Sequence, residues 1–222
     1  KQSSRHPGPA VGQPDPVRVL LDSFEAASVF SATQGELREA GSLGSALGQM
    51  EKTLLIGADL RRPSMAQRCN LAPNHPGLSN FVAGTATLEE SIQYLEALKV
   101  HVMPAGLIPP NPLEMISSKK FAETLATLRE QFDRIVIDSS PVQPVSDGLV
   151  LASYADSVIY VVKSDATYAT HARKGIRRVV GSNEPLTGIV LNQFDAKKAG
   201  RYHYGSKYYE YRDYYQSAKP VS

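Results

Sequence analysis

Four short apolar runs constrain the fold of this chain more than any other feature of its sequence. They lie at residues 53–56, 134–137, 157–162 and 187–191. A continuous apolar run of this length is typical of a strand buried on both faces, as in a parallel sheet. Segments with helical spacing lie between the runs. Buried strands that alternate with helices predict an α/β fold with a doubly wound, mostly parallel sheet.

Four segments show the apolar spacing of an amphipathic helix: residues 17–27, 88–98, 121–132 and 170–180. Residues 28–32 are compatible with a further strand. Residues 36–50 permit a helix, although each of the three glycines within them costs about 1 kcal/mol relative to Ala. With 222 residues, the chain is long enough for one sizeable α/β domain.

The two ends differ in composition from the predicted domain, which spans residues 17–195. Residues 1–16 hold four prolines and two glycines and are predicted to be a flexible linker. Residues 196–222 carry seven of the 11 tyrosines of the chain and are predicted to be a flexible surface tail. These tyrosines are Tyr202, Tyr204, Tyr208, Tyr209, Tyr211, Tyr214 and Tyr215.

The bulk composition argues against several classes of protein. A formal net charge of +2 is too small to indicate a nucleic-acid or membrane-surface partner. The single cysteine, Cys69, excludes an internal disulfide, fits a reducing compartment and is expected to be an ordinary small residue. No apolar run reaches the ~18 residues of a membrane span. Because the sequence begins without Met, a membrane region outside it is compatible with these observations.

Polar side chains follow three of the predicted strands. Asp59, Asp138 and Asn192 stand at or just beyond the strand ends. In parallel α/β sheets, ligands bind outside the carboxyl ends of the strands. These three side chains are therefore expected to converge on one edge of the sheet.

Several stretches resemble motifs of the bacterial tyrosine kinase family (BY-kinases). Residues 54–63, Leu-Leu-Ile-Gly-Ala-Asp-Leu-Arg-Arg-Pro, resemble its second Walker motif, an apolar strand followed by Asp-x-Asp-x-Arg. Residues 134–142, Arg-Ile-Val-Ile-Asp-Ser-Ser-Pro-Val, are similar to its Walker B strand. Residues 103–114 are similar to its Pro-x-Gly-x-x-Pro-Pro-Asn-Pro-x-Glu loop, and residues 188–192 to its Gly-Val-Val-Leu-Asn strand. The tyrosine cluster is a further family trait.

This resemblance implies a P-loop NTPase fold of the MinD and ParA type, in a domain that transfers phosphate from Mg-ATP to tail tyrosines of a neighbouring copy. It implies a place at the cytoplasmic face of the bacterial inner membrane. The implied partners are a membrane polysaccharide co-polymerase segment, in the same or a separate chain, and the machinery that polymerises and exports the polysaccharide. The seven tail tyrosines are then the predicted phosphoacceptors, and no nucleic-acid partner is expected.

The phosphate-binding loop of such a domain reads Gly-x-x-x-x-Gly-Lys-[Ser/Thr], and this chain departs from it. Gly35 still matches a family glycine, and Arg38 keeps the positive charge of the lysine in a larger head group. Leu37 replaces the glycine at which the backbone approaches the phosphate, and Glu39 replaces the hydroxyl that binds Mg²⁺. Gly57 replaces the first Asp of Asp-x-Asp, which removes a carboxylate expected near Mg²⁺. Gly35 and Arg38 are thus interpreted as remnants of a nucleotide site.

Other positions retain the family pattern. The resemblance implies that Asp59 helps to activate the attacking tyrosine and holds metal-bound water, and that Asp138 holds Mg²⁺ through water. Asn192 matches a base-contacting position, and Arg61 and Arg62 match the arginines after the second Asp. No metal ligand is predicted unless Mg²⁺ binds, in which case Asp59 and Asp138 are the candidates. The alternative is an inherited scaffold, in which all five residues act as caps and ion pairs.

Two hypotheses follow. In the first, the domain is a pseudokinase without a cofactor, which acts through its interactions and through a tail that another kinase phosphorylates and a tyrosine phosphatase resets. In the second, it is an active, divergent tyrosine autokinase that uses ATP and Mg²⁺ with Arg38, Asp59 and Asp138. A partition- or division-type ATPase shares the sheet but lacks the tyrosine tail and the Pro-Pro-Asn-Pro loop. Self-association through the family's Glu-x-x-Arg-x-x-Arg helix is in doubt, because residues 17–30 lack that motif.

Overall fold

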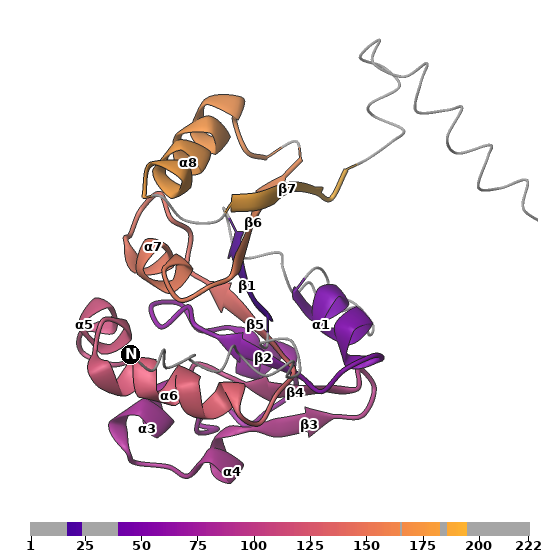
Figure 1. Cartoon of the computed structure of the whole chain (residues 1–222), viewed down its shortest axis with the longest axis vertical. Coiled ribbons are helices and arrows are strands. Elements are labelled where there is room, and N and C mark those ends of the chain that lie inside the picture. Colours follow the sequence, from indigo (N-terminus) through magenta and orange to yellow (C-terminus); the bar gives the residue numbers. More distant parts are fainter. Residues whose placement is uncertain (1–16, 24–39, 165, 183–185, 195–222) are drawn as a thin grey trace, which may run out of the picture.

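The computed structural model describes residues 17–23, 40–164, 166–182 and 186–194. In this part of the chain, seven strands form one sheet in the order β3-β4-β2-β5-β1-β6-β7 (Figure 1). Neighbouring strands run parallel, except that β3 and β4 form an antiparallel pair at one edge. The strands are β1 (Val17–Ser23), β2 (Thr53–Gly57), β3 (Gln93–Leu95), β4 (Val100–Met103), β5 (Arg134–Ser139), β6 (Ser157–Lys163) and β7 (Leu186–Asn192).

Helices cover both faces of the sheet, with α1 on one side and α5 to α8 on the other (Figure 1). Leu47 of α1 and Met65 of α2 pack into a core on the first face. Leu125 of α6, Leu151 of α7 and Val179 of α8 pack into a larger core on the second face. The helices are α1 (Ala40–Gly48), α2 (Met65–Arg68), α3 (Leu78–Ala83), α4 (Leu88–Ser91), α5 (Pro112–Ile116), α6 (Lys119–Arg129), α7 (Asp147–Ala152) and α8 (Ala169–Gly181).

The strand β2 shows why the apolar runs are continuous. Leu54 and Ile56 belong to the core beneath α6, α7 and α8, whereas Leu55 belongs to the core beneath α1 and α2. Every residue of β2 is buried. Because successive side chains of a strand point to opposite faces, a strand covered by helices on both sides needs an apolar residue at each position.

The fold class predicted from the sequence is confirmed. The four predicted strands correspond to β2, β5, β6 and β7. The helices predicted at 121–132 and 170–180 correspond to α6 and α8, and α1 lies within the glycine-containing segment 36–50. Gly48 allows the end of α1 to lie close to the backbone at Lys99, because a Cβ atom at position 48 would overlap the backbone oxygen of Lys99.

The helix predicted at residues 17–27 is wrong over the residues that the structure describes. Residues 17–23 form β1, which lies inside the sheet between β5 and β6. The apolar spacing of Val17, Leu20 and Leu21 fits a helix, but a run this short fits a buried strand equally well. A parallel strand inserted between β5 and β6 pairs backbone groups of both neighbours, and this pairing favours the strand.

The helix predicted at residues 88–98 is wrong beyond its first turn. Thr87 and Glu90 form a capping box that starts α4, but the helix ends at Ser91 and Ile92 is extended, with φ −121° and ψ 132°. The chain then forms β3 and pairs with β4 in a hairpin. Hydrogen bonding to the exposed edge of β4 thus overrides the helical spacing, as tertiary context often does for short segments.

Three further predictions fall on residues outside the described part of the chain. They concern the linker at 1–16, the strand at 28–32 and the tyrosine tail at 196–222.

Two glycines of α8 provide a matched test of the packing of this helix. Gly175 lies against the ring and hydroxyl of the fully buried Tyr160, whereas nothing lies within 4 Å of a Cβ atom at Gly181. We expect Gly175→Ala to lower the free energy of unfolding by about 1–3 kcal/mol, the usual cost of overpacking a core. Gly181→Ala should leave this free energy unchanged or raise it slightly. Urea unfolding of the two variants checks the difference, and equal stabilities would contradict the packing described here.

Candidate functional site

The adjacent strands β2 and β5 bring two of the predicted site residues together at the carboxyl edge of the sheet. Gly57 is paired with Asp138 across the ladder, and the backbone N–H of Ala58 donates to the carbonyl oxygen of Asp138 at 2.7 Å. Asp59 follows directly. Asn192 ends β7, which is three strands away from β5, a distance of about 14 Å at the usual strand spacing. All three residues therefore stand at the carboxyl edge of the sheet, as expected, but Asn192 is three strands away from Asp138.

The carboxylate of Asp59 holds the turn that follows β2. Its Oδ1 atom accepts hydrogen bonds from the backbone N–H groups of Arg61, at 3.1 Å, and Arg62, at 3.0 Å. An Asp that accepts bonds from the backbone two and three residues on stabilises a turn. One oxygen of Asp59 thus serves the local backbone.

The side chain of Arg61 forms a two-pronged ion pair with Asp147, the first residue of α7. Its Nε donates to Oδ2 at 2.6 Å and its Nη2 donates to Oδ1 at 3.0 Å. The Asp147 side chain is only 3% exposed. The hydrogen bond to Asp147 raises the pKa of the Arg61 guanidinium, although burial opposes this shift. The predicted nucleotide remnant Arg61 therefore links the turn after β2 to α7.

Sequence reasoning missed Asp147. It lies 86 residues from Arg61 in the chain, so no spacing rule connects the two. A local signal was present, because an acidic residue favours the first turn of a helix. That signal predicts where a helix starts, but it does not identify the residue with which Asp147 pairs.

The position of Gly57 lies against Met65, a residue that the sequence analysis did not single out. A Cβ atom at Gly57 would lie 3.1 Å from the sulfur and 3.2 Å from the Cβ of Met65. Met65 is 3% exposed and belongs to the core with Leu55 and Val136. A carboxylate side chain at position 57 would therefore begin in tight contact with the apolar thioether of Met65.

Arg68, the last residue of α2, is a third residue that the sequence analysis did not single out. Burial lowers the pKa of its guanidinium, and the charge of Asp138 offsets part of that effect. A guanidinium thus acts electrostatically on the Asp138 carboxylate. A protein cation beside this carboxylate competes with any metal ion that would bind there.

The loop after β4 is held against the start of α3. The backbone N–H groups of Leu78 and Ser79 donate to the carbonyl oxygens of Pro104 and Ala105, at 2.8 and 2.9 Å. The Ser79 hydroxyl donates to the carbonyl oxygen of Leu107 at 2.6 Å. This loop is the one that resembles the Pro-Pro-Asn-Pro motif, and its conformation is set by these contacts within the chain.

Other predicted site residues lie outside the part of the chain that the structure describes, namely Gly35, Arg38 and the seven tail tyrosines. Among the described residues, no group of three His, Cys, Asp or Glu side chains is arranged to hold a metal ion. None of the helices in those same ranges is long and apolar enough to cross a membrane.

Proteins similar to this chain were found both among sequences and among solved structures. CapB of Staphylococcus aureus is 33% identical over 153 residues, which cover 69% of this chain and 67% of CapB. The tyrosine-protein kinase YwqD of Bacillus subtilis is 30% identical, with 78% of this chain and 74% of YwqD covered. The tyrosine-protein kinase Ptk of Acinetobacter johnsonii is 32% identical, but the chain spans only 22% of its length. No family model matches the chain.

Solved structures agree with these sequence relatives. The kinase domain of VpsO superposes with a TM-score of 0.72 and 36% identity, covering 82% of this chain and 86% of that domain. MinD of Pyrococcus horikoshii, solved with Mg-ADP, superposes with a TM-score of 0.62 at 19% identity and covers 80% and 70% of the two chains. The MinD likeness shows the fold alone.

The ion pair of Arg61 predicts a large difference between two neighbouring arginines. Arg61→Met leaves the buried carboxylate of Asp147 without its partner, so we expect a loss of about 2–4 kcal/mol in the free energy of unfolding. Arg62 is exposed and its side chain has no described partner, so Arg62→Met should change stability by less than about 0.5 kcal/mol. Chemical denaturation of both variants measures this, and equal losses would show that the pair is not what stabilises α7.

Cys69 is expected to be unreactive in the folded protein. It is buried, and burial raises the pKa of its thiol to about 11, although the charge of Arg68 partly opposes this shift. At pH 8 only roughly one thiol in a thousand is then a thiolate, the form that reacts with alkylating agents. Iodoacetamide should therefore label the native protein far more slowly than the urea-unfolded protein. The labelling rate of the native protein should rise about tenfold for each unit of pH below the raised pKa. Fast labelling that does not change with pH would contradict this prediction.

Proposed function

Because this chain belongs to the bacterial tyrosine kinase family, we propose that it is a pseudokinase of that family, a kinase-like regulatory domain that does not bind ATP productively. It acts in the polymerisation and export of a capsular or exocellular polysaccharide, through its interactions and its tyrosine tail. Its relatives CapB and YwqD and the VpsO kinase domain support the family. The loss of nucleotide binding is argued from the residues at the carboxyl edge.

The observation that carries the proposal is the contact between Gly57 and Met65. An active site of this type needs oxygen ligands for Mg²⁺, and carboxylates supply them. Here the first carboxylate of the motif is absent, and the position at which it would begin lies against the buried thioether of Met65. A thioether is a soft ligand that does not suit Mg²⁺.

Two further features point the same way. The Arg68 guanidinium acts on Asp138, which is the other carboxylate on the magnesium side. Leu37, Arg38 and Glu39 replace the glycine, lysine and hydroxyl of the phosphate loop. The residues present therefore do not fit Mg-ATP. In this proposal the domain does not transfer phosphate itself.

The alternative function is an active, divergent autokinase that transfers the γ-phosphate of ATP to tail tyrosines. Its support is the retention of Asp138 on β5 and of Asp59 in the turn that follows the adjacent strand β2. However, Asp59 has a structural task in the turn, because its Oδ1 atom binds the backbone of Arg61 and Arg62. That task accounts for an Asp at this position without catalysis.

The proposed setting follows from the family. The domain works at the cytoplasmic face of the inner membrane, next to a polysaccharide co-polymerase segment in the same or a separate chain. A separate kinase phosphorylates tyrosines among residues 201–215, and a tyrosine phosphatase removes the phosphates.

Calorimetric titration of the whole chain with ATP and ADP, with and without Mg²⁺, tests the proposal. We expect no heat of binding at millimolar nucleotide, because Gly57 removes a carboxylate expected near Mg²⁺ and residues 37–39 depart from the phosphate loop. Micromolar, magnesium-dependent binding would overturn the pseudokinase proposal and favour the autokinase.

A second experiment separates the two functions at the tail. Purified protein is incubated with Mg-ATP, alone and with a separate tyrosine kinase, and phosphotyrosine is located by mass spectrometry. The pseudokinase should gain phosphate only with the added kinase. Phosphorylation without it, abolished by Asp59→Ala but retained in Arg62→Met, would establish the autokinase.

A further inference from the structure

The helix α8 presents an unusually basic outer surface. Its 13 residues include His171, Arg173, Lys174, Arg177 and Arg178 and no acidic residue. Arg173, Lys174 and Arg177 are exposed, and none of them forms an ion pair with a carboxylate of the described residues. An unpaired cluster of this kind attracts anionic groups, and guanidinium groups bind phosphate with paired hydrogen bonds.

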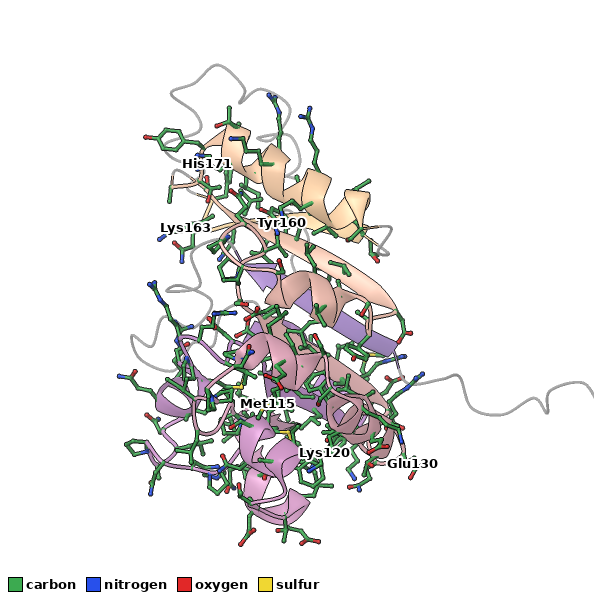
Figure 2. The ribbon with its side chains drawn as sticks, turned by 90° about the vertical axis from the view of Figure 1, so that its left-hand side faces the viewer. Met115, Lys120, Glu130, Tyr160, Lys163 and His171 are labelled. Carbon is green, nitrogen blue, oxygen red and sulfur yellow. The ribbon has the colours of Figure 1, made fainter. Side chains whose placement is uncertain are left out.

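The two flanks of α8 are distinguished by their contacts. Figure 2 shows Tyr160 beneath the helix, and Gly175 contacts its ring. Arg178 donates to the carbonyl oxygen of Gln143 at 2.6 Å, which marks the flank toward the loop before α7. At 100° per residue, Lys174 lies on this same flank, while Arg173 lies across the helix on the flank toward β7. Arg177 follows Arg173 by one turn, so the two guanidinium groups are neighbours.

Beside that second flank, the edge strand β7 carries an exposed apolar strip. Ile189 pairs with Tyr160 and Leu191 pairs with Val162, so both lie on the sheet face that α8 covers. Each is nonetheless 54% exposed. Large aliphatic side chains on a sheet face next to a basic helix form a surface that is apolar on one side and cationic on the other.

These features match one chemical group. A phosphotyrosine combines an aromatic ring, which gains from apolar contact, with a phosphate of charge roughly −1.5 to −2. We propose that Arg173 and Arg177, with the strip of Ile189 and Leu191, form a docking site for phosphotyrosines of this chain's own segment 201–215. The proposal rests on the proposed function in one respect, namely that the tail is phosphorylated.

The path of the chain favours its own tail as the occupant. β7 ends at Asn192, opposite Lys163 of β6, and the Ser164 N–H donates to the carbonyl oxygen of Asn192 at 2.8 Å. The chain therefore leaves at the edge of the sheet from which α8 sets out. The eight residues 195–202 span at most about 28 Å, and the 13 residues of α8 are about 20 Å long. The first tail tyrosine thus reaches any point of α8, at an effective concentration in the millimolar range.

Charge makes the docking conditional on phosphorylation. Residues 201–215 hold three Lys or Arg and two Asp or Glu, which gives 3 − 2 = +1. The unphosphorylated segment is therefore not attracted electrostatically to a basic helix. Two phosphates change its charge to about −2 to −3 and reverse the interaction. The site is therefore empty before phosphorylation and filled after it.

Fluorescence anisotropy with the whole, unphosphorylated chain and synthetic peptides of residues 201–215 tests the proposal. A peptide with phosphotyrosine at Tyr208 and Tyr211 should bind about tenfold or more tightly than the unmodified peptide. A peptide with phosphoserine at these positions keeps the charge but lacks the rings, so it should bind several-fold more weakly than the phosphotyrosine peptide. Raising the salt concentration should weaken binding, because exposed charges are screened.

Matched variants locate the site. Arg173→Gln with Arg177→Gln should weaken phosphotyrosine-peptide binding about tenfold. The control removes the same number of charges elsewhere, by Lys119→Gln with Lys120→Gln on exposed positions of α6, and should bind like the unaltered protein. Figure 2 shows Lys120 at the other end of the molecule from Tyr160 and His171.

Three outcomes would overturn the proposal. Equal losses in the two double variants would show a diffuse attraction without a site. Equal binding of the modified and unmodified peptides would remove the dependence on phosphate. Displacement of the phosphopeptide by anionic phosphatidylglycerol vesicles, bound more tightly through Arg173 and Arg177, would assign the surface to lipid. Because the synthetic peptide supplies its own phosphate, these results do not depend on whether the domain binds ATP.

Discussion

The parallel pairing of β2 with β5, both buried between two helical layers, is the constraint on which the rest of this molecule depends. Their ladder sets Gly57 opposite Asp138 and lets the Ala58 N–H donate to the carbonyl oxygen of Asp138. The turn of Asp59 therefore begins at a defined point of the carboxyl edge. Because both strands are covered on both faces, a shift of one residue would turn each apolar side chain to the other core, and packing on both sides opposes this.

Retained motif residues in this protein have structural partners of their own. Asp59 binds the backbone of its own turn, and Arg61 neutralises the buried carboxylate of Asp147. A buried carboxylate without a partner is costly, so the arginine is needed whether or not a nucleotide binds. The presence of these two residues is therefore weak evidence for catalysis, whereas the loss of the carboxylate at Gly57, a position that Met65 contacts closely, bears directly on metal binding.

The errors of prediction share a physical cause. Residues 17–23 and 93–95 are too short for periodicity to separate a strand from a helix, and in each case a neighbouring strand with free backbone groups decided the outcome. Two residues of the site were missed in the sequence for a related reason. Met65 and Asp147 act through contacts with residues far away along the chain or across a turn, and no local pattern marks such a contact.

The sequence by itself determined the fold class, the family and the departures from its phosphate loop, because these rest on apolar periodicity and on residue types at particular spacings. It also placed Asp59 and Asp138 at or just beyond the ends of two buried strands. Only the tertiary structure decided that Met65 occupies the space beside Gly57, that Arg61 pairs with Asp147, and that Asn192 lies three strands away. These depend on strand order and on side chains that meet across the sheet edge, and strand order is set by packing of the whole domain rather than by any local segment.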